Sequence, residues 1–275
     1  MDEGFGPAAL AIFGGELDEL RSLLANEPDL ATRRSSVSHP TLLQFVACDA
    51  EHMPDPVGAA TVLLDAGADA AAPLVAAAGC GSLSVMECLL DRGADINGST
   101  AHGATSAWSA LDEAVYWVQP EVIASLLARG AEIRALSTAA GIGDLERTRR
   151  FCDGNPIAPD AGPIGSPFAD TVPAELADDP QLILDHGFVM AINAGHRPTA
   201  ELLLNAGAGV NAKPPGYHWQ GTALHAACWR GDRDVVRWLM SIGADPAIRD
   251  GLVDSDAPGW ALYHGHEHLS DLLTR

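Results

Sequence analysis

Short stretches with helical spacing of apolar residues recur along the chain, and each of them ends at a glycine. Examples are LSVMECLLDRG (83–93), PEVIASLLARG (120–130) and DVVRWLMSIG (234–243). A shorter, alanine-rich stretch precedes each one, as TALHAACWRG (222–231) does for the last. The spacing predicts pairs of short helices joined by tight turns, followed by an extended connection.

The phrase that closes each pair is repeated. Its glycines are Gly67, Gly93, Gly130, Gly207 and Gly243, which are 26, 37, 77 and 36 residues apart. A repeat near 33 residues fits if one step is shortened and the longest step spans two repeats plus an insertion. A single helix pair cannot bury its apolar faces alone, so stacked pairs are expected.

These motifs resemble the ankyrin repeat, in a degenerate, bacterial-type form. The resemblance rests on TALHAA (222–227), INAGHRPTAELLLNAGAGVNA (192–212) and the GAD phrases at Gly67, Gly93 and Gly243. It implies an all-α ankyrin-repeat solenoid of about eight helix-turn-helix units with short finger loops. We expect one array over residues 1–275, with Thr222 capping its helix and glycines ending the second helices.

One segment breaks the array. Residues 153–181 are rich in Pro, Gly and Asp, and a structureless loop of that length is uncommon in a compact domain. We expect an inserted loop that either covers the neighbouring groove or is slack between repeats.

Charge narrows the range of partners. The formal net charge is −21, and Lys213 is the only lysine. Such a chain repels nucleic acid and anionic membranes but attracts a basic protein or a cationic small molecule. Five cysteines without a CxxC motif indicate buried free thiols in a reducing compartment, so we expect a cytoplasmic protein. No run of about 18 apolar residues occurs.

Familiar catalytic and metal motifs are absent from the sequence. His264 and His268 in YHGHEH are four residues apart, but Gly265-His266 matches an ankyrin turn and would break a helix between them. We therefore predict neither a metal nor a cofactor. The resemblance implies that His196 and His225 hydrogen-bond backbone groups.

Aromatic residues gather at the positions that face the concave groove in ankyrin folds. Alignment on the turn glycine, or on Val118 in its place, puts eight residues directly before the turns and Glu113, Met190, Ala226 and Trp260 one helical turn earlier. Asp112 replaces a usual histidine, and Trp108, Tyr217, His218 and Trp219 are placed on fingers. Packing and ligand contact stay equal alternatives for these rings, whereas Trp238 is expected in the core. The eight residues before the turns are Tyr116, Trp117, Asn193, Ala194, Trp229, Arg230, Tyr263 and His264.

The resemblance implies a protein–protein interaction module that binds through the groove and fingers. The alternative is a small-molecule-binding protein or an unusual enzyme of hydrolase, isomerase or cyclase type. There, Asp112 or Glu113 would be a general acid or base and His264 the complementary proton carrier. A third reading is an antagonist of a basic protein. Aromatic walls near carboxylates suit a cation at about 0.5–2 kcal/mol per contact.

Overall fold

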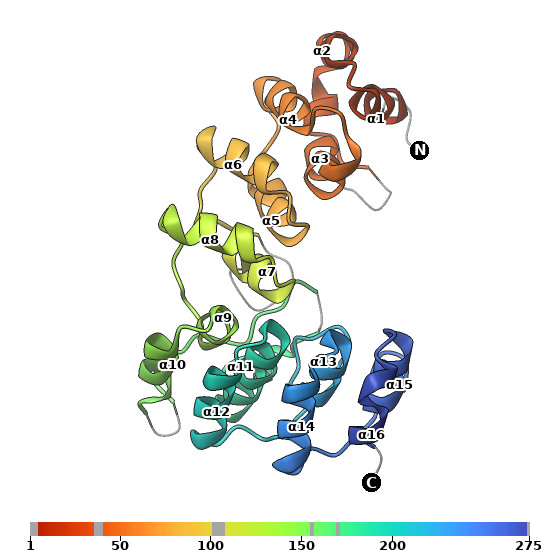
Figure 1. The fold of residues 1–275 in the computed structure, drawn as a ribbon. Coiled ribbons are helices and arrows are strands. Elements are labelled where there is room, and N and C mark those ends of the chain that lie inside the picture. The colour runs from red at the N-terminus through yellow and green to blue at the C-terminus, as the bar shows by residue number, and fades with distance from the viewer. Residues whose placement is uncertain (1–4, 36–40, 101–107, 155–156, 169–170, 274–275) are drawn as a thin grey trace. The chain divides into compact units, whose positions relative to one another are not determined.

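Helices follow one another in pairs throughout the residues that the computed structural model describes, which are 5–35, 41–100, 108–154, 157–168 and 171–273 (Figure 1). Sixteen α-helices form eight pairs within these residues. The chain divides into an N-terminal unit, Met1–Thr100 with Ser109–Glu132, and a C-terminal unit, Ala101–Trp108 with Ile133–Arg275. The predicted all-α repeat fold is confirmed, whereas a single array over 1–275 stays a prediction.

The N-terminal unit holds four helix pairs and two short 3₁₀ segments. A two-residue strand, β1 (Ser99–Thr100), pairs with β2 (Trp108–Ser109). The helices are α1 (Phe5–Gly14), α2 (Leu17–Asn26), η1 (Pro28–Ala31), α3 (Leu42–Asp49), η2 (Ala50–His52), α4 (Pro56–Asp65), α5 (Ala71–Gly79), α6 (Leu83–Asp91), α7 (Ala110–Tyr116) and α8 (Pro120–Ala128).

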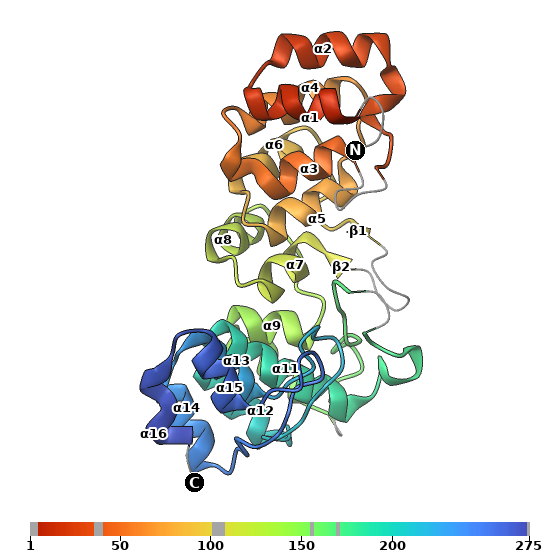
Figure 2. The same ribbon diagram turned by 90° about the vertical axis from the view of Figure 1, so that its right-hand side faces the viewer.

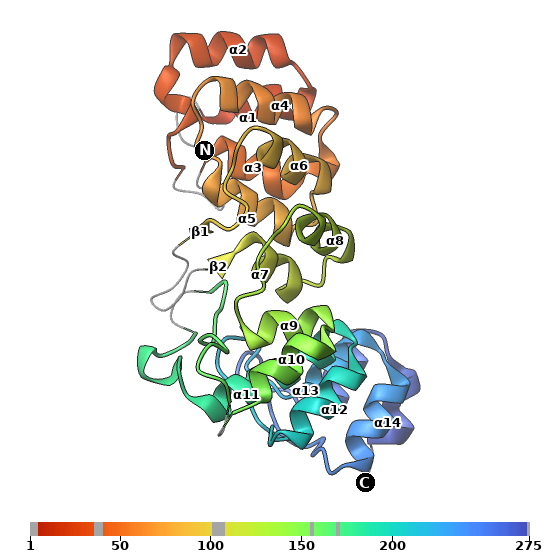
Figure 3. The ribbon, with the colours of Figure 1, turned by 90° about the vertical axis from the view of Figure 1, so that its left-hand side faces the viewer.

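The C-terminal unit also holds four pairs. Its second helices α10, α12 and α14 follow one another along one side of the unit (Figure 3). The helices are α9 (Leu136–Ile142), α10 (Leu145–Cys152), η3 (Ala174–Leu176), α11 (Pro180–Ala194), α12 (Arg197–Asn205), α13 (Ala223–Arg230), α14 (Arg233–Ser241), α15 (Ala257–Tyr263), η4 (Glu267–Leu269) and α16 (Ser270–Leu273).

Small residues let the first helices of successive pairs approach closely. In the N-terminal unit α3, α5 and α7 lie side by side, and in the C-terminal unit α9, α11, α13 and α15 do so. Ala77, Ala114, Ala139 and Ala227 are fully buried on these helices. Close-packed alanines bury apolar area without opening the gaps that a mixture of large side chains would leave.

Capping residues fix where the first helices begin. Ser109 forms a capping box with Asp112, whose carboxylate accepts from the Ser109 backbone N–H at 3.0 Å. Thr222 forms the same motif with His225, whose Nδ1 accepts from the Thr222 N–H at 3.1 Å. The predicted cap at Thr222 is confirmed. These contacts satisfy N–H groups that a helix start leaves unpaired.

The inserted segment is packed where the structure describes it, not slack. Ala161, Ile164, Val172 and Ala177 are buried. The Ala161 carbonyl accepts from the N–H of Leu136 at 2.7 Å, which ties the segment to the start of α9.

The insertion also lengthens the helix that follows it. Asp179 caps α11, and the helix begins at Pro180, slightly before the predicted end of the insertion. In three other pairs the N-cap stands nine residues before the turn: Ser109 before Val118, Thr222 before Gly231 and Asp256 before Gly265. His186 holds that position before Gly195, but here the added turns place it inside the helix.

His186 is a buried polar side chain inside α11. Its ring is only 1% exposed, and neither ring nitrogen has a hydrogen-bond partner among the described residues. The ring stacks on Tyr217 with centroids 4.6 Å apart. Burial lowers the pKa of His186 to about 3, because the charged imidazolium would lose its hydration.

Val118 occupies a turn position with a left-handed backbone. Its φ is +57°, where the equivalent turns of other pairs have Gly143, Gly195 and Gly231. The sequence alignment that put Val118 in place of glycine is therefore confirmed. A β-branched residue is costly in this conformation, by roughly 1–2 kcal/mol.

Replacing Val118 by glycine should stabilise the chain. We expect Val118→Gly to raise the free energy of unfolding by about 0.5–1 kcal/mol, since relief of backbone strain exceeds the added flexibility of the unfolded chain. Urea denaturation followed by circular dichroism measures it. Val57→Gly, in a right-handed helical turn of α4, is the matched control and should lose stability. Equal losses in both variants would contradict the strain at Val118.

The unpartnered His186 should make stability depend on pH. Its folded pKa lies below its unfolded value, so the unfolded chain takes up the proton first. The stabilisation of the folded chain by neutral His186 is therefore complete above about pH 6.5. As the pH falls towards 3, this stabilisation decreases by up to about 1.4 kcal/mol per pH unit. We expect His186→Phe to flatten the dependence between pH 6.5 and 4.5, measured by urea denaturation. Exposed His52→Phe should leave the wild-type slope in place.

Candidate functional site

Five of the predicted groove and finger residues line one cavity in the C-terminal unit. The cavity has a volume of about 540 Å³ and lies between α13, α15 and the loops that precede them. Figure 2 shows these loops together, and the Asn211 side chain joins them through the Gly243 carbonyl at 3.0 Å. The nine residues that line the aromatic pocket are His218, Trp229, Leu252, Val253, Ser255, Gly259, Trp260, Tyr263 and His264.

Two neighbouring helices supply the aromatic walls. Trp229 comes from the end of α13, and its ring centroid lies 5.8 Å from that of His264, which caps α15. Trp260, one turn earlier on α15, lies 5.8 Å from His264 and 6.3 Å from Trp229. Tyr263 is 86% exposed and contacts His264. These four residues share one cavity, and their role in binding stays a prediction.

The pocket rests on rings that the sequence placed on exposed fingers. Trp219 is 1% exposed and contacts Trp229 and Trp260 at centroid distances of 5.6 and 6.4 Å. Tyr217 is fully buried, and its hydroxyl donates to the His186 carbonyl at 2.9 Å. Both rings are core residues beneath the pocket: Tyr217 stacks on His186 of α11, and Trp219 is enclosed by Tyr217, Trp229 and Trp260.

Asp250 organises the loop that forms one wall. Its carboxylate accepts from the N–H groups of Leu252, Val253 and Ser255 at 2.7–2.8 Å, and from Trp260 Nε1 at 3.0 Å. Burial by itself would raise the pKa of this carboxyl, but these hydrogen bonds outweigh it and lower the pKa to about 2. Sequence reasoning missed Asp250, Leu252 and Val253, which lie in an irregular loop.

The walls of the aromatic pocket carry little positive charge. Burial lowers the pKa of both His218 and His264, and His266 lowers that of His264 further. Both imidazoles are therefore largely neutral at pH 7. None of the nine residues lining it is a lysine or arginine.

The other predicted binding residues lie elsewhere. Tyr116 is only 2% exposed, so its predicted projection into a groove is wrong; the ring is packed against Trp117. Trp117 is 36% exposed and donates from Nε1 to Glu113 at 2.9 Å in the N-terminal unit. Trp108, expected on a finger, is 4% exposed. Arg230 is exposed and donates to the Asn193 carbonyl at 2.9 Å without lining the pocket.

The predicted acid–base residues do not meet in this pocket. Asp112 and Glu113 belong to the N-terminal unit, where the Asp112 carboxylate caps α7 and Glu113 accepts from Trp117. His264 belongs to the C-terminal unit, and its pocket has no carboxylate among the lining residues. A catalytic role for Asp112, Glu113 and His264 stays a prediction.

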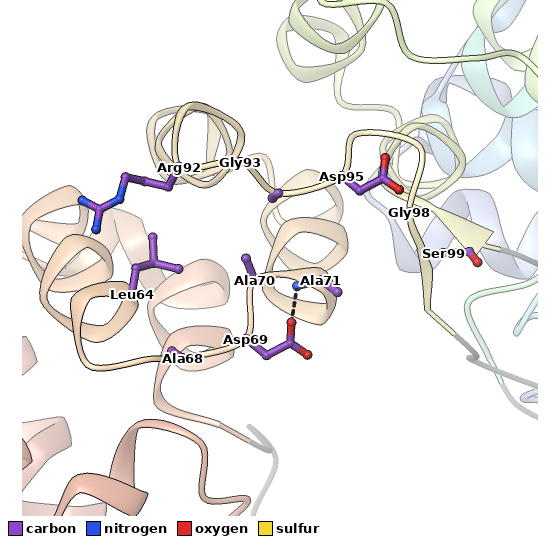
Figure 4. Close-up of a pocket in the computed structure, with 11 residues that line it drawn as sticks. Leu64, Ala68, Asp69, Ala70, Ala71, Arg92, Gly93, Asp95, Gly98 and Ser99 are labelled. Carbon is purple, nitrogen blue, oxygen red and sulfur yellow. Dashed lines mark hydrogen bonds between the residues drawn. The ribbon is translucent and has the colours of Figure 1, made fainter.

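A second cavity, of about 410 Å³, lies in the N-terminal unit (Figure 4). It lies between the short loop after α4 and the longer loop after α6. These two loops flank the repeat that is shortened in the sequence. Asp69 accepts from the Ala71 N–H at 3.1 Å, and this contact caps the next helix instead of pointing to a ligand. The walls carry no aromatic ring, so the cavity is the weaker candidate.

His266 and His268 of YHGHEH contact backbone carbonyl groups, whereas His264 lines the aromatic pocket. The helix ends before His264 and the chain turns at Gly265, as predicted. His268 contacts the Gly231 carbonyl at 3.2 Å, and His196 is hydrogen-bonded to the Gly141 backbone. Over the described residues, no cluster of three or more His, Cys, Asp or Glu is placed to hold a metal.

No helix in the described part of the chain has the length and apolar character needed to cross a bilayer.

Removing the charge of Asp250 should loosen the pocket wall. We expect Asp250→Asn to lower the free energy of unfolding by about 1–3 kcal/mol, since four hydrogen bonds lose their charged acceptor. Urea denaturation measures the loss. The matched control, Asp254→Asn, removes a carboxylate that is 81% exposed and paired with Arg249, and should change stability by about 0.5 kcal/mol or less. Similar losses in both variants would contradict the role of Asp250.

Comparison with protein families identifies the repeats. A model of three successive ankyrin repeats matches residues 185–250, and a single-repeat model matches residues 69–101. No curated protein sequence matches the chain significantly. The matched segments include α11–α14 of one unit and α5–α6 of the other, and the remaining helices form pairs of the same kind. The chain is therefore an ankyrin-repeat protein.

Proposed function

We propose that this protein is an interaction module whose aromatic pocket receives a cationic side chain of a partner protein. Ankyrin repeats are generally protein–protein interaction modules. The observation that carries the finer proposal is the grouping of Trp229, Trp260 and Tyr263 around one cavity whose imidazoles are neutral. Aromatic rings attract a cation through their quadrupole, most strongly for tryptophan.

The charge around the pocket supports a cationic occupant. The buried Asp250 carboxylate lies directly behind Trp260, and Asp254 and Asp256 follow on the same loop. With a net charge of −21, the chain steers basic surfaces toward it and repels acidic ones. A guanidinium fits this chemistry better than an ammonium, because its plane also stacks on aromatic rings.

Exposed apolar residues beside the pocket supply the rest of an interface. Leu252 and Val253 are 56% and 65% exposed and line it. Apolar residues that surround an aromatic anchor exclude water from it and strengthen the contact. This patch is therefore suited to a partner that presents a basic residue among apolar ones.

A cationic or aromatic small molecule is the second candidate occupant. The volume of about 540 Å³ lies within the range of small-molecule sites, roughly 300–1,000 Å³. The pocket walls offer binding groups but do not place a general acid and a general base in contact. The proposed role of the pocket is therefore ligand binding.

Truncating Tyr263 should weaken binding without unfolding the protein. Tyr263 is 86% exposed and lines the pocket, whereas Leu262 is 65% exposed and does not. We expect Tyr263→Ala to weaken binding of an arginine-containing partner or peptide about tenfold, which corresponds to loss of one aromatic anchor. Leu262→Ala is the matched control and should bind within about threefold of wild type.

Partners recovered by affinity capture are first tested as full-length proteins and then as peptides by calorimetry. Each peptide is compared with its Arg→Gln form, which keeps a planar polar group but loses the charge. Equal binding of the charged and neutral peptides would remove the cation from the proposal. Binding that is unchanged in Tyr263→Ala would exclude the aromatic pocket as the binding site.

A further inference from the structure

The two residues before the turn of each helix pair touch the next pair in a fixed register. We call the residue directly before the turn the last inner residue and the one before it the penultimate inner residue. Penultimate Trp229 contacts last His264 of the next pair, with ring centroids 5.8 Å apart. The carbonyl of penultimate Asn193 accepts from last Arg230 at 2.9 Å.

The same register holds in the N-terminal unit. A Cβ atom built on penultimate Gly79 would lie 3.0 Å from Cδ1 of last Trp117. Three examples in the two units therefore place the penultimate residue of one pair against the last residue of the following pair. The cause is the similar separation of packed first helices, which brings the same two positions into contact in successive pairs.

Cysteines occupy both positions at one such step. Cys48 stands seven residues after the cap Thr41, as Trp229 does after Thr222, so it is the penultimate residue of its pair. Cys80 directly precedes Gly81, whose φ is +73°, so it is the last residue of the next pair. Their helices α3 and α5 lie side by side (Figure 1), so the register places Cys48 against Cys80.

The five cysteines have different environments, which corrects the expectation that all are buried. Cys80 is exposed, Cys48 is half-buried, and only Cys228 is buried. Interaction between the two thiols lowers the pKa of Cys80 and raises that of Cys48. Burial raises the pKa of Cys152 to about 11 and that of Cys228 to about 12, so these thiols are poor nucleophiles.

We infer that Cys48 and Cys80 form a redox-active thiol pair, which a small-molecule disulfide such as oxidised glutathione converts reversibly into an intramolecular disulfide. Cys80 is the exposed member that meets the oxidant. Cys48 lies behind it as the resolving thiol, held in place by the register of the repeats.

The exchange balances in two steps. The Cys80 thiolate attacks one sulfur of glutathione disulfide, breaks the S–S bond and releases one glutathione thiolate, leaving Cys80 as a mixed disulfide. Cys48 then loses its proton to the solvent or to the released thiolate and attacks the Cys80 sulfur, expelling the second glutathione. Two protein thiols are oxidised by two electrons, and one glutathione disulfide is reduced to two thiols.

The disulfide would join two successive helix pairs beside a polar part of the N-terminal unit. Gly79, next to Cys80, packs against Glu113 and Trp117, so a bond at Cys80 lies next to the Trp117–Glu113 contact. Oxidation would fix α3 relative to α5 and reduce the freedom of the unfolded chain between them. Redox state would thereby set the rigidity of this unit.

The experiment uses the reduced full-length protein in glutathione buffers of graded redox ratio, quenched with N-ethylmaleimide and analysed by mass spectrometry. We expect two of the five thiols to be lost together and a Cys48–Cys80 peptide to appear under non-reducing digestion. Cys48→Ser should stop at one glutathione on Cys80, and Cys80→Ser should leave Cys48 reduced. Cys88→Ser, in the same unit, is the matched control and should form the disulfide as wild type does.

A second measurement compares thiol reactivity before any disulfide forms. The iodoacetamide rate at Cys80 should exceed that at Cys88 by about tenfold at pH 7, and Cys48→Ala should reduce the Cys80 rate because it removes the neighbouring thiol. A wild-type protein that retains glutathione on Cys80 without the cross-link would overturn the proposal. Equal oxidation of Cys80, Cys88 and Cys152 would also overturn it.

Discussion

The structure depends on one constraint: a pair of short helices cannot bury its apolar face alone and must pack against the next pair. Fully buried alanines such as Ala77, Ala114 and Ala227 keep the first helices close together within each unit. This spacing determines which side chains meet along a unit. The contacts Gly79–Trp117, Asn193–Arg230 and Trp229–His264 occur at equivalent positions for that reason, although their chemistry differs completely.

The insertion 153–181 departs from the repeat and yet contributes to the candidate site. It lengthens α11 towards its N-terminus and thereby places His186 beneath Tyr217. From Tyr217 the ring contacts continue through Trp219 to Trp229 at the pocket. Phe168 of the insertion also contacts His218, a wall residue, at 5.1 Å. The irregular segment therefore supports the aromatic pocket from its inner side.

The sequence predicts the local features of this fold well. Helix periodicity, caps and turn residues act over a few neighbouring positions, so the helix pairs, the cap at Thr222 and even the glycine-like turn at Val118 could be found. Tyr116 and Trp219 show where such reasoning ends. Each was placed by its position in a repeat or finger, but its burial depends on segments distant in sequence. Periodicity identifies the position, not what covers it.

That distinction also explains why equivalent positions can carry unrelated chemistry in the two units. The backbone at the inner positions is fixed by helix packing, whereas the side chains there are not required to fill the alanine-rich core. In the N-terminal unit these positions hold Cys48 and Cys80, and in the C-terminal unit they hold Trp229 and His264. The first pair suits thiol exchange and the second suits contact with a flat cationic group. Substitution at two positions can therefore change what a unit does while the stacking that folds it stays the same.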